Sequence, residues 1–235
     1  MRILIVDQCS GSKQRPDWFD AFDAETIDSH SLAELRARDQ TPIYPAHDLY
    51  TGQQQKYINE AVDRLREVGD TVDRCYISAG FGFVSETTEL PPYEVTFRNY
   101  DTAGIQDRSK DLGIEADLLD QIDTESAYDL VFLALGGDYY EALDLSRILD
   151  AIPESTMVVL FNREGDTERR QNAVSIPART AEAKEQGSTV VALKGHYLKQ
   201  FAAFRANGRT VESLSELIEY CTTEQTPQSG LDAYD

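Results

Sequence analysis

The sequence predicts an α/β fold, a single three-layer domain with a mixed or mostly parallel sheet flanked by helices. Two observations predict it. Short, continuously apolar segments such as RILIV (2–6) and TMVVLF (156–161) alternate with segments whose apolar residues recur at helical spacing. In the segment 52–69, for example, Tyr57, Ile58, Ala61, Val62 and Leu65 share one face. Continuously apolar strands are typical of a sheet covered by helices on both faces.

The same patterns predict each element in turn. We expect further strands over 73–80 (DRCYISAG), 128–137 (YDLVFLALGG) and 188–195 (STVVALKG). We expect helices over 31–39, 52–69, 113–122, 138–152, 196–208 and 211–221. Because no clean linker interrupts them, we expect one domain over 1–222 and a flexible C-terminal tail over 223–235.

The charge balance is strongly acidic. The 235 residues include 22 Lys and Arg against 42 Asp and Glu, for a net charge of −20. Spread along the chain, this excess resembles the solvated surface of a halophilic archaeal protein. It argues against nonspecific DNA binding, which weakens steeply with salt. The last third leans basic, and it could hold a nucleic-acid backbone or pair with the acidic surface. Its basic residues are Arg163, Arg169, Arg170, Lys194, Lys199 and Arg205.

Several classes of protein are not indicated. No apolar stretch is long enough to span a membrane and no signal pattern opens the chain, so we expect a cytoplasmic protein without membrane contact. Cys9, Cys75 and Cys221 form no C-x-x-C pair, which argues against a disulfide framework. Their spacing to histidines supports no metal site, and nothing predicts a cofactor.

The first candidate site is the turn CSGSK, which follows the strand at 2–6. It lacks the Walker A spacing, but backbone N–H groups of Ser10, Gly11 and Ser12, together with Lys13, could bind an anion or a polar ligand. Cys9 could be a nucleophile activated by Lys13, or a small core residue. Both readings stay open at this point.

A second candidate is the turn before the helix at 52–69. His47 could act in acid–base catalysis or be a solvated loop residue. Tyr50 offers a stacking face and a hydroxyl. Thr51 could cap the helix that begins near Gly52, whose N-terminus would then face an anion.

Two further turns follow predicted strands. Ser78, Gly80 and Gly82 allow close backbone approach, and Pro92 stiffens the loop that aims Tyr93, which could stack on a base or simply pack. In the fourth turn, we expect Asp138 to cap the helix at 138–152, and it could also contact a sugar hydroxyl. Gly136 and Gly137 precede it.

The order of these motifs resembles the YaaA-like superfamily, whose members have a strand, a turn of the type SA-x-x-G and a Pro-Tyr pair. Ser78, Ala79, Gly82, Phe83, Pro92 and Tyr93 match that pattern. The Cys9, Ser10 and Lys13 turn is similar to one in the middle domain of archaeosine synthases. These resemblances imply a fold like that of uracil-DNA glycosylases and a pocket for a nucleobase. They also link the chain to oxidative stress and DNA binding.

We therefore expect a strand-end pocket for a nucleobase, nucleotide or modified nucleoside, serving nucleic-acid modification or repair. If the protein is an enzyme, we expect a transferase or hydrolase acting on a nucleobase or nucleoside, with Lys13, Cys9 or His47 as the reactive group. Two alternatives remain. One is a noncatalytic DNA-binding protein of the oxidative-stress response, which the charge does not favour. The other is a partner-binding domain without chemistry.

Overall fold

The structure is a computed structural model that describes residues 1–124, 126–168 and 170–224. Arg169 and the part of the predicted tail over 225–235 lie outside the described residues.

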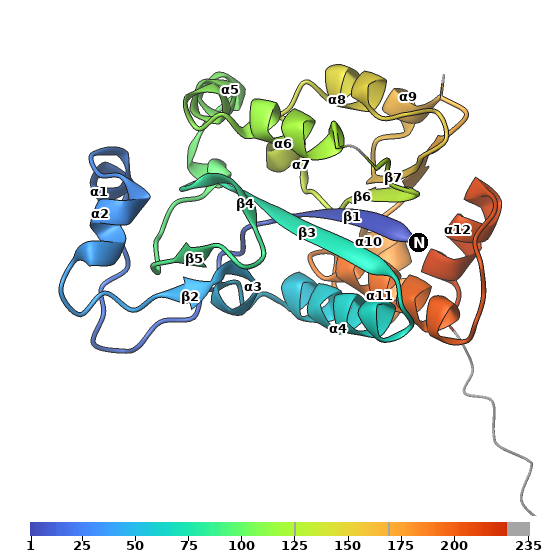
Figure 1. Ribbon diagram of the computed structural model, residues 1–235, viewed down its shortest axis with the longest axis horizontal. Helices are drawn as coiled ribbons and strands as arrows, with labels where there is room; N and C mark the ends of the chain where they lie inside the picture. The colour runs from blue at the N-terminus through green and yellow to red at the C-terminus, as the bar shows by residue number, and fades with distance from the viewer. Residues whose placement is uncertain (125, 169, 225–235) are drawn as a thin grey trace, which may run out of the picture.

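A six-stranded sheet runs through the molecule in the order β4-β3-β1-β6-β7-β8 (Figure 1). All neighbouring strands are parallel except β4, which pairs antiparallel with β3. The fold-class prediction is confirmed. The strands are β1 (Arg2–Gln8), β3 (Thr71–Ser78), β4 (Gly82–Ser85), β6 (Leu130–Leu133), β7 (Met157–Phe161) and β8 (Ala173–Ile176).

The parallel strands follow the chain order 2-1-3-4-5, so the chain leaves β1 toward β3 and later returns to the other side of β1 as β6. The carboxyl ends of β1 and β6 therefore form a topological switch point, the place where open α/β sheets bind ligands.

Helices cover both faces of the sheet (Figure 1). Alternate residues of β1 face opposite layers, since Ile3 and Ile5 belong to one buried cluster and Leu4 and Val6 to the other. The first layer holds α4 (Gln53–Glu67), α10 (Thr180–Glu185), α11 (Leu193–Ala206) and α12 (Leu214–Thr222). The second holds α5 (Thr102–Asp111), α6 (Ile114–Ile122) and α8 (Leu145–Ala151).

A long insertion separates β1 from α4 and lies beyond the carboxyl ends of β1 and β3 (Figure 1). Its elements are α1 (Ala24–Asp28), α2 (Leu32–Ala37), β2 (Tyr44–Pro45) and α3 (Ala46–Leu49). β2 pairs with β5 (Glu89–Leu90), and a 3-10 turn, η1 (Phe97–Asn99), follows. The insertion therefore reaches the segment that carries Tyr93.

The strand prediction over 188–195 is wrong. This stretch is a turn that runs into α11, and Val190 and Val191 are 40% and 62% exposed. Gly195 is consequently a helix residue. The sheet takes β8 instead, a strand that the sequence did not predict. Its four residues include the polar Ser175 and therefore do not form a continuous apolar run.

Two cap predictions are also wrong. The helix predicted over 138–152 is split into α7 (Gly137–Tyr140) and α8, and the N-cap of α7 is Gly136, which leaves Asp138 exposed in the first turn. Asp144 caps α8 by accepting from Arg147 N. The N-cap of α4 is Gly52 and not Thr51, so no side chain caps this helix.

Gly195 sets the approach of α11 to α4, because a Cβ at this position would lie 2.5 Å from the carbonyl oxygen of Gln54. We expect Gly195→Ala to force the helices apart and to lower the free energy of unfolding by about 1–3 kcal/mol. Urea titration in molar KCl measures this. Gly165→Ala is the control, since nothing lies within 4 Å of that Cβ. Equal stabilities for the two variants would contradict the packing argument.

Candidate functional site

The switch point is built from the ends of two strands and the beginnings of two helices. Gly136 N donates to Gln8 Oε1 at 2.5 Å, which joins the ends of β1 and β6. The turn after β1 lies against the start of α4, since a Cβ on Gly52 would lie 2.4 Å from Ser10 Oγ. The segment Cys9–Lys13 therefore crosses the carboxyl edge of the sheet.

Six side chains meet at this turn, two of them from the turn itself and four from other segments, and we call them the strand-end cluster. Five of them are buried, with exposed fractions between 0% and 8%, and Lys13 is half-buried. The cluster consists of Cys9, Lys13, Tyr50, Ser78, Tyr93 and Tyr139. The structure thus brings together five predicted site residues and adds Tyr139.

The hydroxyl groups of three cluster residues hydrogen-bond to one another. Ser78 Oγ accepts from Gly80 N at 3.2 Å and from Phe81 N at 3.0 Å. Its hydroxyl lies 2.7 Å from Tyr93 Oη and is also hydrogen-bonded to Tyr50, whose Oη lies 2.8 Å from Tyr93 Oη. Tyr50 and Tyr93 are each 1% exposed, so protein encloses this network.

Lys13 covers the ring of Tyr93. Its Nζ lies 4.2 Å from the ring centroid and donates to Ser10 O at 2.8 Å. Burial lowers the pKa of the Lys13 ammonium, and the nearby Cys9 and Glu94 partly oppose that shift. A lysine held this way is closer to its neutral, nucleophilic form than a surface lysine.

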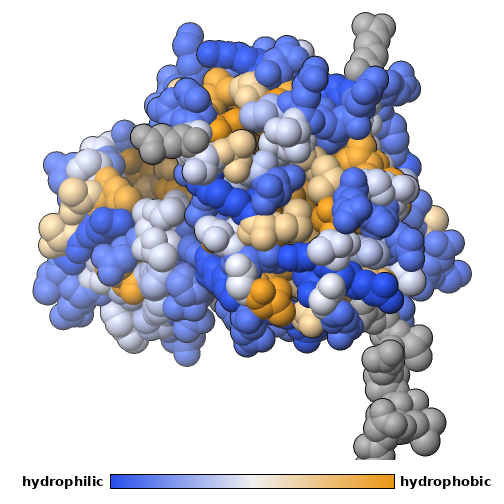
Figure 2. All heavy atoms as spheres, turned by 45° about the vertical axis from the view of Figure 1, so that its right-hand side comes forward, coloured by the Kyte–Doolittle hydropathy of each residue, from blue (hydrophilic) through white to orange (hydrophobic). Residues whose placement is uncertain are grey.

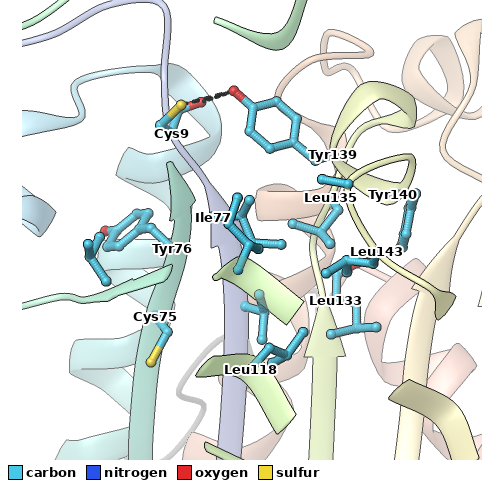
Figure 3. Packing of buried hydrophobic residues seen from close by; sticks show 14 of the residues in the cluster. Cys9, Cys75, Tyr76, Ile77, Leu118, Leu133, Leu135, Tyr139, Tyr140 and Leu143 are labelled. Carbon is cyan, nitrogen blue, oxygen red and sulfur yellow. Dashed lines mark hydrogen bonds between the residues drawn. The ribbon is translucent and has the colours of Figure 1, made fainter. Parts of the chain in front are cut away.

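Cys9 differs from the other two cysteines. Its Sγ lies 2.9 Å from Tyr139 Oη, whose hydroxyl also donates to Cys9 O at 3.3 Å (Figure 3). Burial raises the pKa of Tyr139 and, to about 12, that of the Cys75 thiol. Cys75 and Cys221 are buried, and their thiols make no hydrogen bond among the described residues. Only Cys9 therefore combines a polar partner with a nearby lysine.

The other predicted residues of three turns, the ones after β1, before α4 and after β6, form a rim. Gly11, Ser12, Gly137 and Asp138 are exposed. Ser10, Thr51, Gly52 and Gly136 are half-buried. This rim is open to solvent above the buried cluster.

The predicted stacking role of Tyr50 and Tyr93 is not supported, because both residues are 1% exposed. A Cβ on Gly80 would lie 2.7 Å from the ring of Tyr93, so that glycine makes room for the ring. Gly82, at φ +76°, lies against Leu112 O instead of the cluster.

Pro92 and His47 have other surroundings. The Pro92 carbonyl accepts from Phe22 N. His47 Nδ1 lies 2.8 Å from Glu86 O, and its ring borders a cavity of about 400 Å³ with Arg66 and Arg74. Among the described residues, His47 makes no hydrogen bond or ion pair to a member of the strand-end cluster, so we do not propose it as a reactive group.

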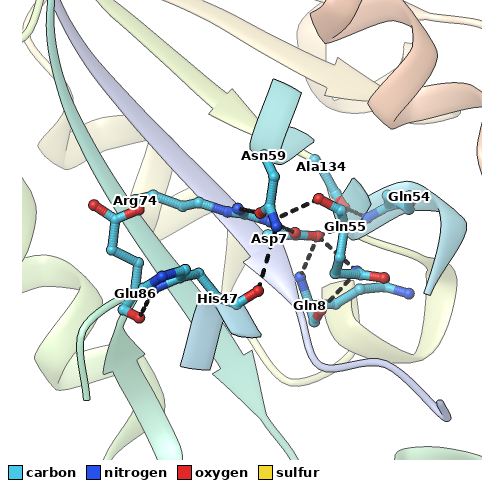
Figure 4. Close-up of polar contacts among 9 residues, drawn as sticks. All are labelled: Asp7, Gln8, His47, Gln54, Gln55, Asn59, Arg74, Glu86 and Ala134. Carbon is cyan, nitrogen blue, oxygen red and sulfur yellow. Dashed lines mark hydrogen bonds and ion pairs between the residues drawn. The ribbon is translucent and has the colours of Figure 1, made fainter. Parts of the chain in front are cut away.

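A second cluster, absent from the sequence prediction, lies directly below the end of β1. Asp7 is fully buried and pairs with Arg74 at 2.8 Å, while Gln54 and Gln55 donate to Asp7 Oδ1 at 2.7 and 3.2 Å (Figure 4). Lys194, 8% exposed, interacts electrostatically with Asp7. We call these five residues the Asp7 cluster. The sequence features that could have indicated this cluster are Asp7, a carboxylate at the end of an apolar strand, and the glutamines Gln54 and Gln55 at the start of a helix.

Five basic residues of the last third pair with acids, while Lys194 has no ion pair among the described residues. Arg170 bonds to Asp150 at 2.5 Å and Lys199 to Glu60 at 2.6 Å. Arg163, Arg179 and Arg205 have carboxylate partners as well. The face drawn in Figure 2 is mostly hydrophilic with scattered apolar patches. Among the described residues, these cations do not form the unpaired basic surface that a nucleic-acid backbone needs.

No helix of the described residues is long and apolar enough to cross a membrane. No group of three or more His, Cys, Asp or Glu side chains within the described ranges is placed to hold a metal ion.

Comparison with known proteins assigns the chain to no family. No protein-family model matches the chain, and no curated protein matches it. The resemblance to the YaaA-like superfamily therefore stays a prediction.

The Asp7–Arg74 pair has a testable energetic role. Arg74→Met leaves a buried carboxylate without its charge partner, so we expect the free energy of unfolding to fall by about 3–5 kcal/mol. Adding Asp7→Asn removes that charge, and we expect the double variant to be more stable than Arg74→Met alone. Urea titration of wild type, both single variants and the double variant measures the coupling. Additive losses would show that the two charges do not depend on each other.

The lowered pKa of Lys13 predicts a pH dependence. The folded pKa lies below the ordinary value of 10.5, so between the two values the unfolded chain binds more protons. We expect wild type to gain stability relative to Lys13→Met as the pH rises through the alkaline range toward 10.5. Urea midpoints of both proteins at several alkaline pH values measure the difference. Parallel curves would mean that Lys13 titrates alike in the folded and unfolded chains.

Proposed function

We propose that the carboxyl edge of the sheet binds a nucleobase or nucleoside, with the strand-end cluster as the floor of the site. One observation carries the proposal: Cys9, Lys13 and the hydroxyl groups of Tyr50, Ser78 and Tyr93 lie together at the carboxyl edge beside the topological switch point, where open α/β sheets bind ligands.

The groups around Tyr50 fit the edge of a base. A nucleobase presents ring nitrogens and carbonyl oxygens beside exocyclic N–H donors. Tyr50 would donate to such an acceptor, and Lys13 and the Ser10–Ser12 backbone would bind a second polar atom. Because Lys13 covers Tyr93 and donates to Ser10 O, binding requires the turn Ser10–Lys13 to shift outward.

The same site offers groups for covalent chemistry at the base. Cys9 has a hydroxyl partner at 2.9 Å, and the lowered pKa of Lys13 favours an amine that can give or take a proton. In this proposal Cys9 is the nucleophile, Lys13 the acid–base group and Tyr50 the donor to the reacting base. Transfer or hydrolysis at a nucleobase is the matching reaction class.

A second candidate is a partner-binding domain without chemistry. Its support is the closed packing of the cluster, where Tyr50, Ser78 and Tyr93 are 0% or 1% exposed. In that case the cluster is only a polar part of the core, and small ligands leave the stability of the protein unchanged.

A thermal-shift experiment separates the two candidates. In molar KCl, a nucleoside or 7-deazaguanine at a hundredfold excess over its Kd should stabilise the fold by about 2.7 kcal/mol and raise the Tm by roughly 5–10 °C. We expect Lys13→Ala to abolish the shift, while Lys110→Ala, an exposed lysine of α5, keeps it. No shift with any base, or an unchanged shift in Lys13→Ala, would favour the partner-binding domain.

A further inference from the structure

The amine of Lys13 has unusual surroundings for a lysine. Its Nζ donates to the carbonyl oxygen of Ser10 at 2.8 Å and makes no ion pair with a carboxylate among the described residues. A carboxylate partner would favour the protonated amine, which is not a nucleophile. The side chain is half-buried, so it is partly withdrawn from water but can still be reached from the rim of the site. The Lys13 amine is therefore available for attack on a ligand.

The other five lysines of the chain each lack one of these features. Lys199 also lies over a tyrosine ring, 5.1 Å from its centroid, but it pairs with Glu60 at 2.6 Å. Lys194 is only 8% exposed, so protein encloses it. The remaining three are exposed to solvent: Lys56, Lys110 and Lys184. Lys13 alone combines an unpaired amine, partial burial and a place at the carboxyl edge of the sheet.

The surroundings of Lys13 suit both ends of one reaction. Burial lowers the pKa of the Lys13 ammonium, which favours the neutral amine that attacks a carbon atom. The ring of Tyr93 lies 4.2 Å from Nζ, and the face of an aromatic ring attracts a positive charge on that atom. An amine that reacts with an aldehyde starts neutral and ends as a protonated imine, which is cationic. The site therefore favours the reactant and stabilises the product.

We propose that Lys13 forms an imine with an aldehyde carbon of the ligand, namely the open-chain form of a sugar that has lost its base. The inference rests on the proposed nucleoside site and deepens it, because hydrolysis between base and sugar leaves a hemiacetal that opens to an aldehyde. The bond between Nζ and the carbon forms, and the carbonyl oxygen leaves as water with the two hydrogens of the amine. Cys9 and Glu94, whose charges act on Lys13, are titratable groups that can carry these protons.

Trapping of the imine in the full chain tests the inference. The protein is incubated with 2-deoxyribose in molar KCl, and cyanoborohydride reduces the imine to a stable secondary amine. Peptide mass spectrometry then locates the added mass, which is that of the sugar less one oxygen atom. We expect Lys13 to be labelled at least about tenfold faster than Lys110 or Lys199, because each unit by which an amine pKa falls raises its neutral fraction tenfold. Equal labelling rates for these three lysines overturn the inference.

Two matched variants locate the reactive amine. Lys13→Arg keeps a positive charge beside Ser10 O and the Tyr93 ring but removes the nucleophilic amine. We expect the intact variant to lose the fast adduct. Lys199→Arg removes a lysine that also lies over a ring, and it should keep the fast adduct of wild type. A nucleoside in excess should slow the labelling of Lys13 and leave that of Lys110 unchanged.

The outcomes distinguish the two proposals. Fast labelling of Lys13, without a thermal shift or protection by any nucleoside, supports the imine and overturns the nucleoside site. A thermal shift with a nucleoside, while Lys13 is labelled no faster than Lys110, overturns the imine and leaves the nucleoside site. If Lys13→Arg fails to fold, wild type decides alone, since the peptide map compares all six lysines within one protein.

Discussion

The ion pair between Asp7 and Arg74 is the interaction on which the carboxyl edge depends. Both side chains are withdrawn from water, which is costly unless every remaining polar atom is bonded. Gln54 and Gln55 must therefore reach Asp7, and this requirement fixes where α4 begins. The start of α4 in turn places Tyr50, three residues earlier, under the turn that carries Cys9 and Lys13. One buried pair thus determines the position of two clusters.

The unsatisfied polar groups are concentrated at the same edge. Of the four buried side-chain atoms without a hydrogen bond among the described residues, three belong to Gln54, Arg74 and Tyr76, which lie around Asp7 and Tyr50. A core selected only for stability would satisfy or replace them, since each costs free energy. Their concentration at a topological switch point is what a ligand site requires.

Local pattern predicts the parts of this structure that local forces determine. The apolar run of β1 and the helical spacing of α4 were sufficient to predict these two elements. The turns after parallel strands located Cys9, Lys13 and Ser78, because such strand ends share one edge. Tyr50 was located by the turn before α4, and Tyr93 by the loop that Pro92 stiffens. The apolar residues over 188–195 led to a wrong strand prediction, because Val190 and Val191 have the side chains typical of a buried strand but are exposed. β8 is too short and mixed to be recognised. Asp7, Arg74 and Lys194 meet across 67 and 187 residues of sequence, so no local pattern could join them.

The acidic surface and the buried polar clusters are both compatible with a solvent of high salt concentration. If the protein works in molar salt, as its charge predicts, charges separated by more than about 3 Å of solution are screened, and surface ion pairs such as Lys199–Glu60 contribute little. Charges enclosed by protein are screened far less. A protein with a net charge of −20 can therefore still hold an anion, provided that the contacts are short and desolvated. The Asp7–Arg74 pair at the carboxyl edge shows such enclosure, because its contact is 2.8 Å long and its side chains are 0% and 1% exposed, whatever the sign of the surface.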